Sequence, residues 1–518
     1  MHFYFNPLNK ACKSRTGAFP RGAVVTFRIF WDGNGDMPQD LDASFVFFQD
    51  GKERTALSMQ RMENGFSVSL RFNQIGLFFY YFRVGGEFFG CGKWRDGVIS
   101  KKADMRTWQI TVYEEHYETP AWMKGGVMYQ IFPDRFYKVG NRPIADWKVR
   151  REDWGGMPSY RPNEYGKVLN NDFFGGNLNG ITEKLDYLKS LGITVIYLNP
   201  IFEAYSNHRY DTGDYLKIDT QLGTTEDFDR LIAEAKKRGI HIVLDAVLNH
   251  TGSDSRYFNR YGRYDSVGAY QSPSSPYYEW YRFRNFPDSY ESWWGIDTLP
   301  AVNEHAASYQ NFIFGEDGVL KTWLRHGIGG YRLDVADELP DFFLQKLRTA
   351  VKEQTPDAVV IGEVWEDASN KIAYSERRQY LQGYELDSVM NYPLKDAIIS
   401  FVQSGNTSQL KETMYMLIDN YPKQTLDCLM NILGTHDTPR ILTVLGGKTC
   451  ANKDEMAVTS MNEKEVEAAK KKLKMAAVLQ FTLPGIPCVY YGDENAMQGY
   501  QDPFCRGCFD WVNTDEEL

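Results

Sequence analysis

The sequence predicts an α/β protein: a (β/α)8 barrel with a small subdomain inserted after the third barrel strand, preceded by an N-terminal β-sandwich. From residue 126 onward, apolar strand-like segments alternate with helical segments, which is the pattern of such a barrel. Residues 1–118 instead contain short strand-like runs separated by Gly, Asn and Asp, which is typical of a sandwich. Residues 251–307 are rich in Tyr, Ser and Pro, and are too long for an ordinary loop.

The N-terminal domain, residues 1–118, is predicted from five runs: "AVVTFRIF", "SFVFFQD", "GFSVSLRF", "GLFFYYFRV" and "TWQITVY". The segment "ETPAWMKGG" that follows is predicted to be a linker. We place the first part of the barrel in 119–250, the inserted subdomain in 251–307 and the remainder of the barrel in 308–518.

The barrel prediction depends on eight strand candidates: "GVMYQIF", "TVIYLNPIF", "IHIVLDAVLNH", "IGGYRLDVADE", "AVVIGEVWE", "LDSVMNYPL", "CLMNILGTHD" and "IPCVYYGDE". Amphipathic spacing predicts helices between them, over 178–192, 224–239, 309–327, 340–354 and 463–483.

Composition excludes several classes of function. The net charge of −10 argues against nucleic acid or an anionic membrane as the main partner, and no apolar run is long enough to span a bilayer. The start "MHFYFNPLNK" has no secretion-signal pattern, and the seven cysteines are scattered and odd in number, so we expect reduced thiols and a cytoplasmic location. The aromatic content of 15% fits large cores or a carbohydrate cleft. "CRGC" at 505–508 is a single CxxC and a weak metal or redox signal.

Polar residues gather where the predicted strands end, which is where barrel enzymes hold their chemistry. The residues concerned are Asp245, Asn249, His250, Arg332, Asp334, Glu363, His436 and Asp437. Buried polar groups often only complete a hydrogen-bond network. Three carboxylates from three strand ends are harder to explain in that way, because like charges packed together are costly.

Alternation along a strand places Arg332 and Asp334 on one face. Such an arginine would lower the pKa of Asp334 and keep it ionised as a nucleophile. Glu363, beside apolar groups, would have a raised pKa and act as acid and then base, which together gives retaining glycosidic cleavage. Asp437 would hydrogen-bond sugar hydroxyls and strain the ring, and His250 and His436 suit hydroxyl recognition. No HExxH, GxxxxGK[ST] or strand-linked GxGxxG is present, so metalloprotease and nucleotide chemistry lack support.

Taken in order, "DAVLNH", "GYRLDVADE", "GEVW" and "LGTHDTPR" resemble the four signature regions of the α-amylase family of glycoside hydrolases, over about residues 126–511. "SNHRYDTGDY", "YESWWGIDTLPAVN" and "LDSVMNYPL" further resemble the branch of neopullulanases, cyclomaltodextrinases and maltogenic amylases. That branch carries an N-terminal β-sandwich, which often contributes to dimerisation or glucan binding. A homodimer through this domain is therefore an expectation.

The resemblance implies that Asp334 is the nucleophile, Glu363 the acid/base and Asp437 the transition-state stabiliser. It also implies a set of substrate-binding residues: Arg332, Asp245, His250, His436, Tyr210, Asp211, Asp502, Arg506, Trp365 and Glu338. Tyr210 would stack on the attacked glucose, and Trp365 and Glu338 would lie on the acceptor side. Plain packing is the alternative for Tyr210 and Trp365.

Three departures from the branch bear on these expectations. Calcium-binding members have an Asn/Asp-rich loop after the first strand and an aspartate in "GGDL". Here those segments are "YKVGNRPIADWK" and "GGNLNG", with Asn177, so no cofactor is expected, and a bound calcium ion stays open as the alternative. "LPAVN" has Ala301 where a lysine is often found, so acceptor preference does not transfer. The resemblance implies an eighth barrel helix and a C-terminal β-domain after "DWVNTDEEL", which we expect to be missing here.

The main functional hypothesis is retaining hydrolysis of α-1,4-glucosidic bonds in maltodextrins, cyclodextrins or pullulan, with some transglycosylation. One alternative is a glucan-binding barrel that has lost catalysis. Another is a different α-glucosidase or α-amylase specificity.

Overall fold

The structure is a computed structural model that describes residues 2–50, 52–100 and 105–518. By internal contacts the chain divides into two compact units. Unit 1 comprises Met1–Thr119 together with Trp365–Ser388 and Asp396–Leu429; unit 2 comprises Pro120–Val364, Val389–Lys395 and Met430–Leu518.

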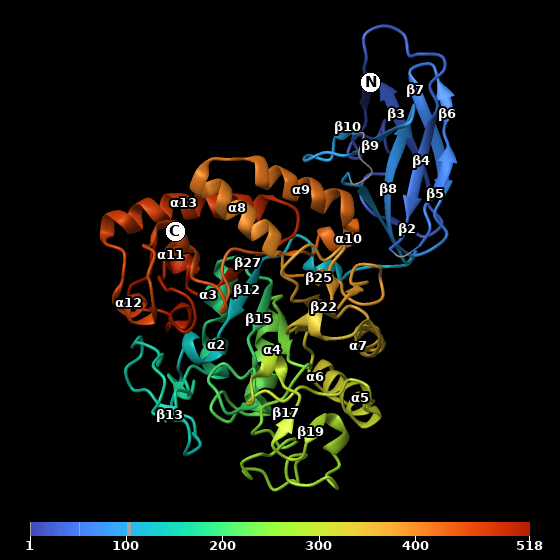
Figure 1. Ribbon diagram of the computed structural model, residues 1–518. Coiled ribbons are helices and arrows are strands. Elements are labelled where there is room, and N and C mark those ends of the chain that lie inside the picture. The colour runs from blue at the N-terminus through green and yellow to red at the C-terminus, as the bar shows by residue number, and fades with distance from the viewer. Residues whose placement is uncertain (1, 51, 101–104) are drawn as a thin grey trace. The chain divides into compact units, whose positions relative to one another are not determined.

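Unit 1 contains the predicted β-sheet domain (Figure 1). One sheet has the order β1-β3-β7-β6, and the other runs β10-β9-β8-β11-β2, with β4 pairing β8 and β5 pairing β4. The strands are β1 Phe3–Tyr4, β2 Phe19–Pro20, β3 Val24–Trp31, β4 Ala43–Phe48, β5 Thr55–Ser58, β6 Gln60–Met62, β7 Gly65–Arg71, β8 Gly76–Val84, β9 Glu87–Cys91, β10 Gly97–Ser100 and β11 Trp108–Tyr113. The five predicted runs correspond to β3, β4, β7, β8 and β11, whereas the remaining strands were missed because most are short.

An aromatic core holds the sheets of unit 1 together. Phe5, Phe27, Phe45, Tyr80 and Trp108 are fully buried, and their rings pack edge to face, tilted or, for Tyr80 with Trp108, stacked, at centroid distances of 4.6–6.2 Å. Each such side chain removes a large apolar area from water, so this core is the main stabilising term of the domain.

A buried ion cluster joins the N-terminal segment of unit 1 to its later segments. Asp419, fully buried in helix α9 (Ser408–Asn420), accepts from Lys13 Nζ at 2.9 Å and pairs with Arg95. These two cations hold the pKa of Asp419 below its usual value although burial opposes them. Gln109 Nε2 likewise donates to Ser369 Oγ at 2.9 Å. Residues far apart in sequence therefore form one packed body.

Unit 2 contains the predicted barrel, and Figure 1 shows its strands surrounded by helices. All pairings recorded in this sheet are parallel, in the order β25-β22-β21-β18-β15-β12-β27-β26, and a parallel bridge between Met390 and Met430 joins its two ends. In chain order the strands are β12 Met128–Ile131, β15 Val195–Leu198, β18 His241–Ala246, β21 Gly330–Leu333, β22 Val359–Gly362, β25 Ser388–Val389, β26 Met430–Ile432 and β27 Ile486–Tyr490. The eight strand predictions are confirmed.

The principal helices that follow these strands are α2 Leu178–Glu183, α3 Leu185–Ser190, α4 Thr225–Lys237, α5 Ala307–Phe314, α6 Val319–Arg325, α7 Asp341–Gln354, α8 Tyr392–Ser404, α11 Ile441–Gly446 and α13 Glu463–Thr482. Capping boxes fix the starts of α4, through Thr224 and Asp227, and of α13, through Asn462 and Glu465. The single helix predicted over 309–327 is wrong, because the Gly315–Gly318 turn divides it into α5 and α6.

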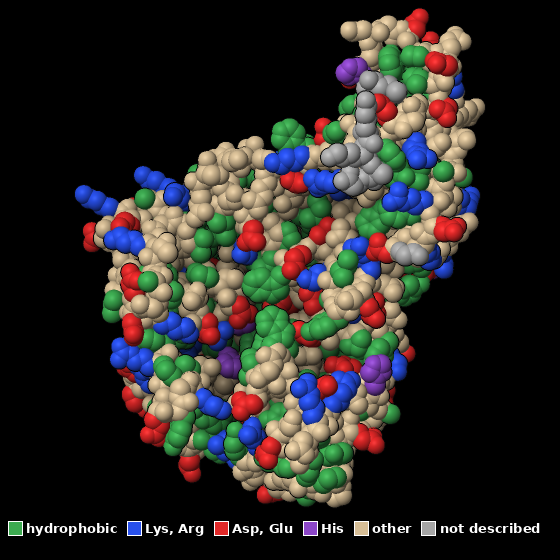
Figure 2. Space-filling view, in the orientation of Figure 1, with side chains coloured by type: hydrophobic (Ala, Val, Ile, Leu, Met, Phe, Trp, Pro, Cys, Tyr) green, Lys and Arg blue, Asp and Glu red, His purple; other side chains and the backbone are tan. Residues whose placement is uncertain are grey.

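The 251–307 segment is mostly irregular. It contains one short hairpin, β19 Phe283–Asn285 with β20 Ser289–Tyr290, and it packs through aromatic contacts such as Phe258 with Tyr281 and Tyr290. Across the face shown in Figure 2, Lys and Arg side chains are interspersed with Asp and Glu. In the described part of the chain, no helix is long and apolar enough to cross a membrane.

Candidate active site

The predicted site residues of unit 2 meet at the carboxyl ends of the barrel strands. Asp245 lies on β18, directly across from Arg332 on β21, while Asp334 and Glu363 follow β21 and β22. Asp437 follows β26. Because parallel strands end at the same rim of a barrel, these side chains converge there.

Arg332 is fully buried and contacts three carboxylates. Its Nη1 donates to Asp245 Oδ1 and to Asp334 Oδ1, both at 2.9 Å, and its Nη2 lies 2.8 Å from Glu363 Oε2. Asp334 and Glu363 therefore each contact one terminal nitrogen of the same guanidinium group. Three carboxylates around one cation leave an excess of negative charge, which opposes the ionisation of Asp334.

The predicted net lowering of the Asp334 pKa is wrong. Burial raises the pKa of Asp334 well above its usual value, and the nearby charges of Glu363, Asp245 and Asp437 raise it further. Arg332 opposes this rise but does not reverse it. The sequence indicated the ion pair, but it did not indicate that the arginine is shared or that burial would outweigh it.

The turn after Asp334 is strained. Val335 has a φ of 39°, in the left-handed region that β-branched residues rarely adopt. This conformation directs the Val335 N–H at Glu363 Oε2, at 2.8 Å. The strained turn thus gives Glu363, the proposed acid/base, a backbone hydrogen-bond donor. Backbone strain that is retained in this way is typical of functional sites. Sequence reasoning missed this role.

Tyr210 lies at the centre of a second network. Its hydroxyl donates to Asp245 Oδ2 at 2.7 Å, accepts from Asn199 Nδ2 at 2.9 Å and lies 2.6 Å from His436 Nε2. Its ring stacks on that of His436 at 5.2 Å. Tyr197, on β15, also donates to Asp245 Oδ2, at 2.5 Å. Asp245 is thereby held by two tyrosines and an arginine.

The tautomer of His436 follows from Gln130 on β12. The Gln130 amide nitrogen donates to Asn199 Oδ1 at 3.0 Å and lies 2.9 Å from His436 Nδ1. His436 Nδ1 is then the acceptor, so Nε2 carries the proton and donates toward the Tyr210 hydroxyl or to Asp437 Oδ2, which is 3.0 Å away. No pattern in the sequence pointed to Gln130, which lies within an apolar strand.

Both site histidines are uncharged at neutral pH. Burial lowers the pKa of His250 to about 4, and burial together with Arg506 lowers the pKa of His436 well below its usual value. His250 Nε2 lies 3.1 Å from the carbonyl of Tyr210, and its ring stacks on Trp293. Neutral imidazoles that already have fixed partners suit hydroxyl recognition.

Asp437 lies at the more accessible edge of the site, with its side chain 33% exposed. Arg506 Nη2 donates to Asp437 Oδ1 at 3.2 Å, and Arg506 Nη1 lies 2.8 Å from Asp502 Oδ1. The structure thus brings Asp502 and Arg506 next to Asp437. The neighbouring thiol of Cys505 donates to the carbonyl of His436, and burial raises its pKa to about 12, so this part of "CRGC" is structural.

Asp211 and Glu338 each hold another residue near the site through a hydrogen bond. Asp211 accepts from the Ser206 backbone N–H at 3.1 Å and from its hydroxyl, and thereby fixes the turn that carries Tyr210; burial raises the pKa of Asp211 to about 6. Glu338 Oε1 accepts from Trp294 Nε1 at 2.9 Å.

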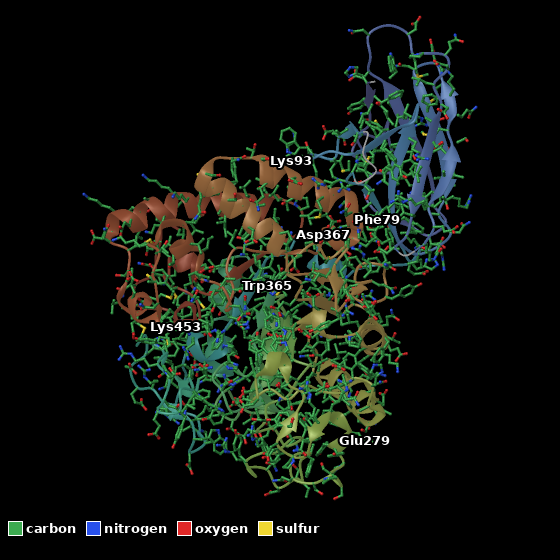
Figure 3. All side chains as sticks on the ribbon, viewed as in Figure 1. Phe79, Lys93, Glu279, Trp365, Asp367 and Lys453 are labelled. Atoms are coloured by element: carbon green, nitrogen blue, oxygen red, sulfur yellow. The ribbon has the colours of Figure 1, made fainter. Side chains whose placement is uncertain are left out.

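Two adjacent tryptophans form an aromatic stack beside His250. Trp293 packs between His250, at 5.5 Å, and Trp294, at 5.4 Å, and Trp294 is 77% exposed. The sequence placed this pair in the inserted subdomain but did not assign it a role. Trp365, labelled in Figure 3, is half-exposed and belongs to unit 1.

Asn177, in the segment compared above with calcium-binding members, has a structural role. Asn177 caps helix α2, accepting from the Gly180 N–H at 2.9 Å and donating to the carbonyl of Val139. Within the described residues, no group of three or more His, Cys, Asp or Glu side chains could hold a metal ion.

The chain is similar in sequence to several known proteins. Residues 130–517 match the α-amylase catalytic domain. An amylopullulanase from Thermoanaerobacterium saccharolyticum is 37% identical over 97% of this chain and 42% of its own length. A cyclomaltodextrinase from Geobacillus thermopakistaniensis is 36% identical over 76% of this chain and 60% of its own.

A solved cyclic α-maltosyl-(1→6)-maltose hydrolase from Arthrobacter globiformis, in complex with that sugar, has a TM-score of 0.63. It is 35% identical and covers 76% of this chain and 79% of its own. The chain spans between 29% and 42% of the length of three amylopullulanases that it matches.

Proposed function

Because the chain belongs to the α-amylase family, we propose that it is a retaining glycoside hydrolase that cleaves α-1,4-glucosidic bonds in maltodextrins, cyclodextrins or pullulan. The observation that carries the proposal is the contact of Asp334 and Glu363 with one guanidinium, on different nitrogens. Two carboxyl groups that flank one bond at short range are the requirement of the retaining mechanism.

The reaction proceeds in two displacements. The Asp334 carboxylate attacks the anomeric carbon while Glu363 gives its proton to the departing glycosidic oxygen, so the C–O bond breaks and a glycosyl ester forms. Water then gives a proton to Glu363 and attacks the same carbon, which frees Asp334. A sugar hydroxyl in place of water gives transglycosylation. The productive state has a protonated Glu363 and an ionised Asp334.

The surrounding groups position the sugar. The Tyr210 ring offers an apolar face, and the neutral His250 and His436 offer hydrogen bonds to hydroxyls without adding charge. Asp437, held by Arg506, is placed to stabilise positive charge that develops on the ring. Trp293, Trp294 and Glu338 supply the acceptor side, supported by the Trp294–Glu338 hydrogen bond.

The choice of substrates is supported by the relatives' names, which include cyclomaltodextrinase, neopullulanase and maltogenic α-amylase. Pullulan is included on equal terms because three amylopullulanases match over 97–98% of this chain, while cyclomaltodextrinases match over 91% and 99% of it. The test is product analysis after incubation with β-cyclodextrin, pullulan and starch, with Asp334→Asn as the control. Maltose or panose is expected, and the absence of sugar release from all three would refute the proposal.

We also propose that catalysis needs no metal or cofactor. The support is the use of Asn177 as a helix cap, which leaves its amide committed. Activity and melting temperature are expected to be unchanged after dialysis against EDTA, and unchanged again when calcium is restored. A loss that calcium reverses would contradict this.

A homodimer through the N-terminal domain and a cytoplasmic location are two further proposals. The homodimer is supported only by the presence of the sandwich, and sedimentation of the full chain, compared with a chain lacking the sandwich, would test it.

The cytoplasmic location is supported by seven free cysteines, which fit a reducing compartment. Fractionation of source cells would test it.

A further inference from the structure

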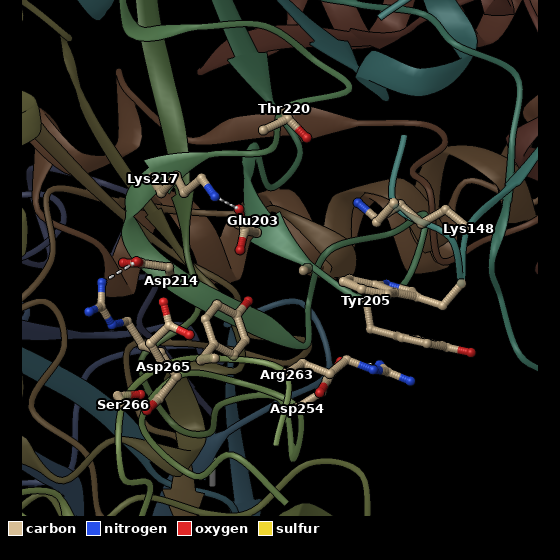
Figure 4. A pocket seen from close by; sticks show the side chains of 15 residues that line it. Lys148, Glu203, Tyr205, Asp214, Lys217, Thr220, Asp254, Arg263, Asp265 and Ser266 are labelled. Atoms are coloured by element: carbon tan, nitrogen blue, oxygen red, sulfur yellow. Dashed lines mark hydrogen bonds and ion pairs between the residues drawn. The ribbon is translucent and has the colours of Figure 1, made fainter. Parts of the chain in front are cut away.

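A pocket in unit 2 is lined by residues other than the proposed catalytic ones (Figure 4). Its volume is about 440 Å³, within the range of about 300–1,000 Å³ of small-molecule sites. Its walls come from the segment after β12, from the β16–β17 hairpin (Phe202–Ala204 and Thr212–Ile218) and from residues 254–266. Neither Asp334 nor Glu363 lines it.

Three aromatic rings line this pocket: Trp147, Tyr205 and Tyr264. The guanidinium of Arg263 lies 4.7 Å from the Trp147 ring centroid and 5.1 Å from that of Tyr205, so it packs against both rings. Trp147 keeps 38% of its surface exposed. Rings of this kind, held in place and partly exposed, offer apolar faces to a flat ligand.

The charges of the wall neutralise one another. Lys217 pairs with Glu203, Arg256 pairs with Asp214 at 2.7 Å, and Arg263 pairs with Asp254, as the contacts in Figure 4 illustrate. Lys148 pairs with Asp219 behind the wall, at 2.6 Å.

The lining thus has four cationic side chains, namely Lys148, Lys217, Arg256 and Arg263. It also has four carboxylates, namely Glu203, Asp214, Asp254 and Asp265, so its net charge is zero. Such a wall presents many hydrogen-bond donors and acceptors without a field that would attract an ion.

We propose that this pocket binds an uncharged oligosaccharide, at a site separate from the catalytic one. A sugar ring has apolar faces, which can stack on the aromatic rings of this pocket. It also has hydroxyl groups around its edge, which can hydrogen-bond to the ion-paired side chains of the lining. The choice of an α-glucan as ligand rests on the proposed function. Tyr205 directly precedes the Ser206–Asp211 turn that carries Tyr210, so the same loop serves both sites.

The experiment is calorimetric titration of the full chain with maltotriose, in the Asp334→Asn background to block turnover. Two binding sites per chain are expected. Adding Trp147→Ala should weaken one of them at least tenfold and leave the other unchanged. Trp94→Ala removes an equally exposed tryptophan that does not line the pocket, and should leave both sites intact. Trp147→Phe keeps an aromatic face and should weaken the second site less than tenfold.

A single site in the parent protein, or two sites unaffected by Trp147→Ala in a protein that melts normally, would overturn the inference. Equal binding of an oligogalacturonate trimer at the Trp147 site would also overturn it, because the wall would then not select neutral sugars. If the unsubstituted enzyme hydrolyses glucans but shows one site, this inference fails alone. If Trp147-dependent binding occurs without any hydrolysis, the proposed function fails alone.

Discussion

Arg332 Nη2 lies 2.8 Å from Glu363 Oε2, so the arginine that pairs with the proposed nucleophile also contacts the proposed acid/base. The charge of Glu363 is one of the causes that raise the pKa of Asp334, after burial. Catalysis needs the state with one proton in the pair, which predicts a bell-shaped dependence of kcat/KM on pH.

Arg332→Lys should shift that profile. Arg332 opposes the rise in the pKa of Asp334, and a lysine cannot contact three carboxylates with the same planar geometry. The pKa of Asp334 should therefore rise further, so the acid limb of the profile should move to higher pH and kcat should fall about 100-fold or more. The measurement is kcat/KM for maltotriose from pH 4 to pH 9. An unshifted acid limb would show that Arg332 does not act through Asp334.

Substitution of the two carboxyls should separate their roles. With natural glucans, Glu363→Gln should lose about 10²–10⁴ in rate, the usual contribution of general acid–base catalysis. With α-maltosyl fluoride it should keep a far larger share of its rate in the first displacement, because fluoride leaves without a proton. Asp334→Asn should be inactive on both. Pre-steady-state release of fluoride measures this difference, and equal losses for Glu363→Gln on both substrates would contradict the assignment.

Tyr210→Phe tests whether the hydroxyl or the ring of Tyr210 matters more. The substitution keeps the face that stacks on His436 but removes hydrogen bonds to Asp245, Asn199 and His436. We expect kcat/KM to fall about 10- to 100-fold, since one buried hydrogen bond to a charged group contributes roughly 1.5–3 kcal/mol. Tyr210→Ala should lose more, and the pair of variants is compared by steady-state kinetics. Equal losses would assign the effect to the hydroxyl alone.

The strands of this fold were predictable because their apolar runs are continuous and are followed by polar residues. The same rule identified Asp245, Arg332 and Glu363, which lie at the strand ends. It could not identify Gln130, which lies inside an apolar strand, or the Val335 turn, whose positive φ conflicts with β-branched preference. The direction of the Asp334 pKa also failed, because burial is a property of the assembled barrel and not of the local pattern.

Asp493 should make the stability of the protein depend on pH. Burial raises its pKa to about 7, although Arg440 Nη1 lies 3.1 Å from its Oδ1. A carboxyl whose pKa is higher in the folded state favours folding at low pH. That contribution is lost as the pH rises from about 4, where the unfolded group titrates, through about 7.

The titration of Asp493 between pH 5 and pH 8 should therefore lower the free energy of unfolding by on the order of 2 kcal/mol, at about 1.4 kcal/mol per pKa unit. Asp493→Asn keeps an acceptor for Arg440 but cannot titrate. The melting temperature of the variant should accordingly change less between these two pH values than that of the parent. Parallel pH curves for the two proteins would mean that Asp493 has the same pKa in the folded and unfolded chains.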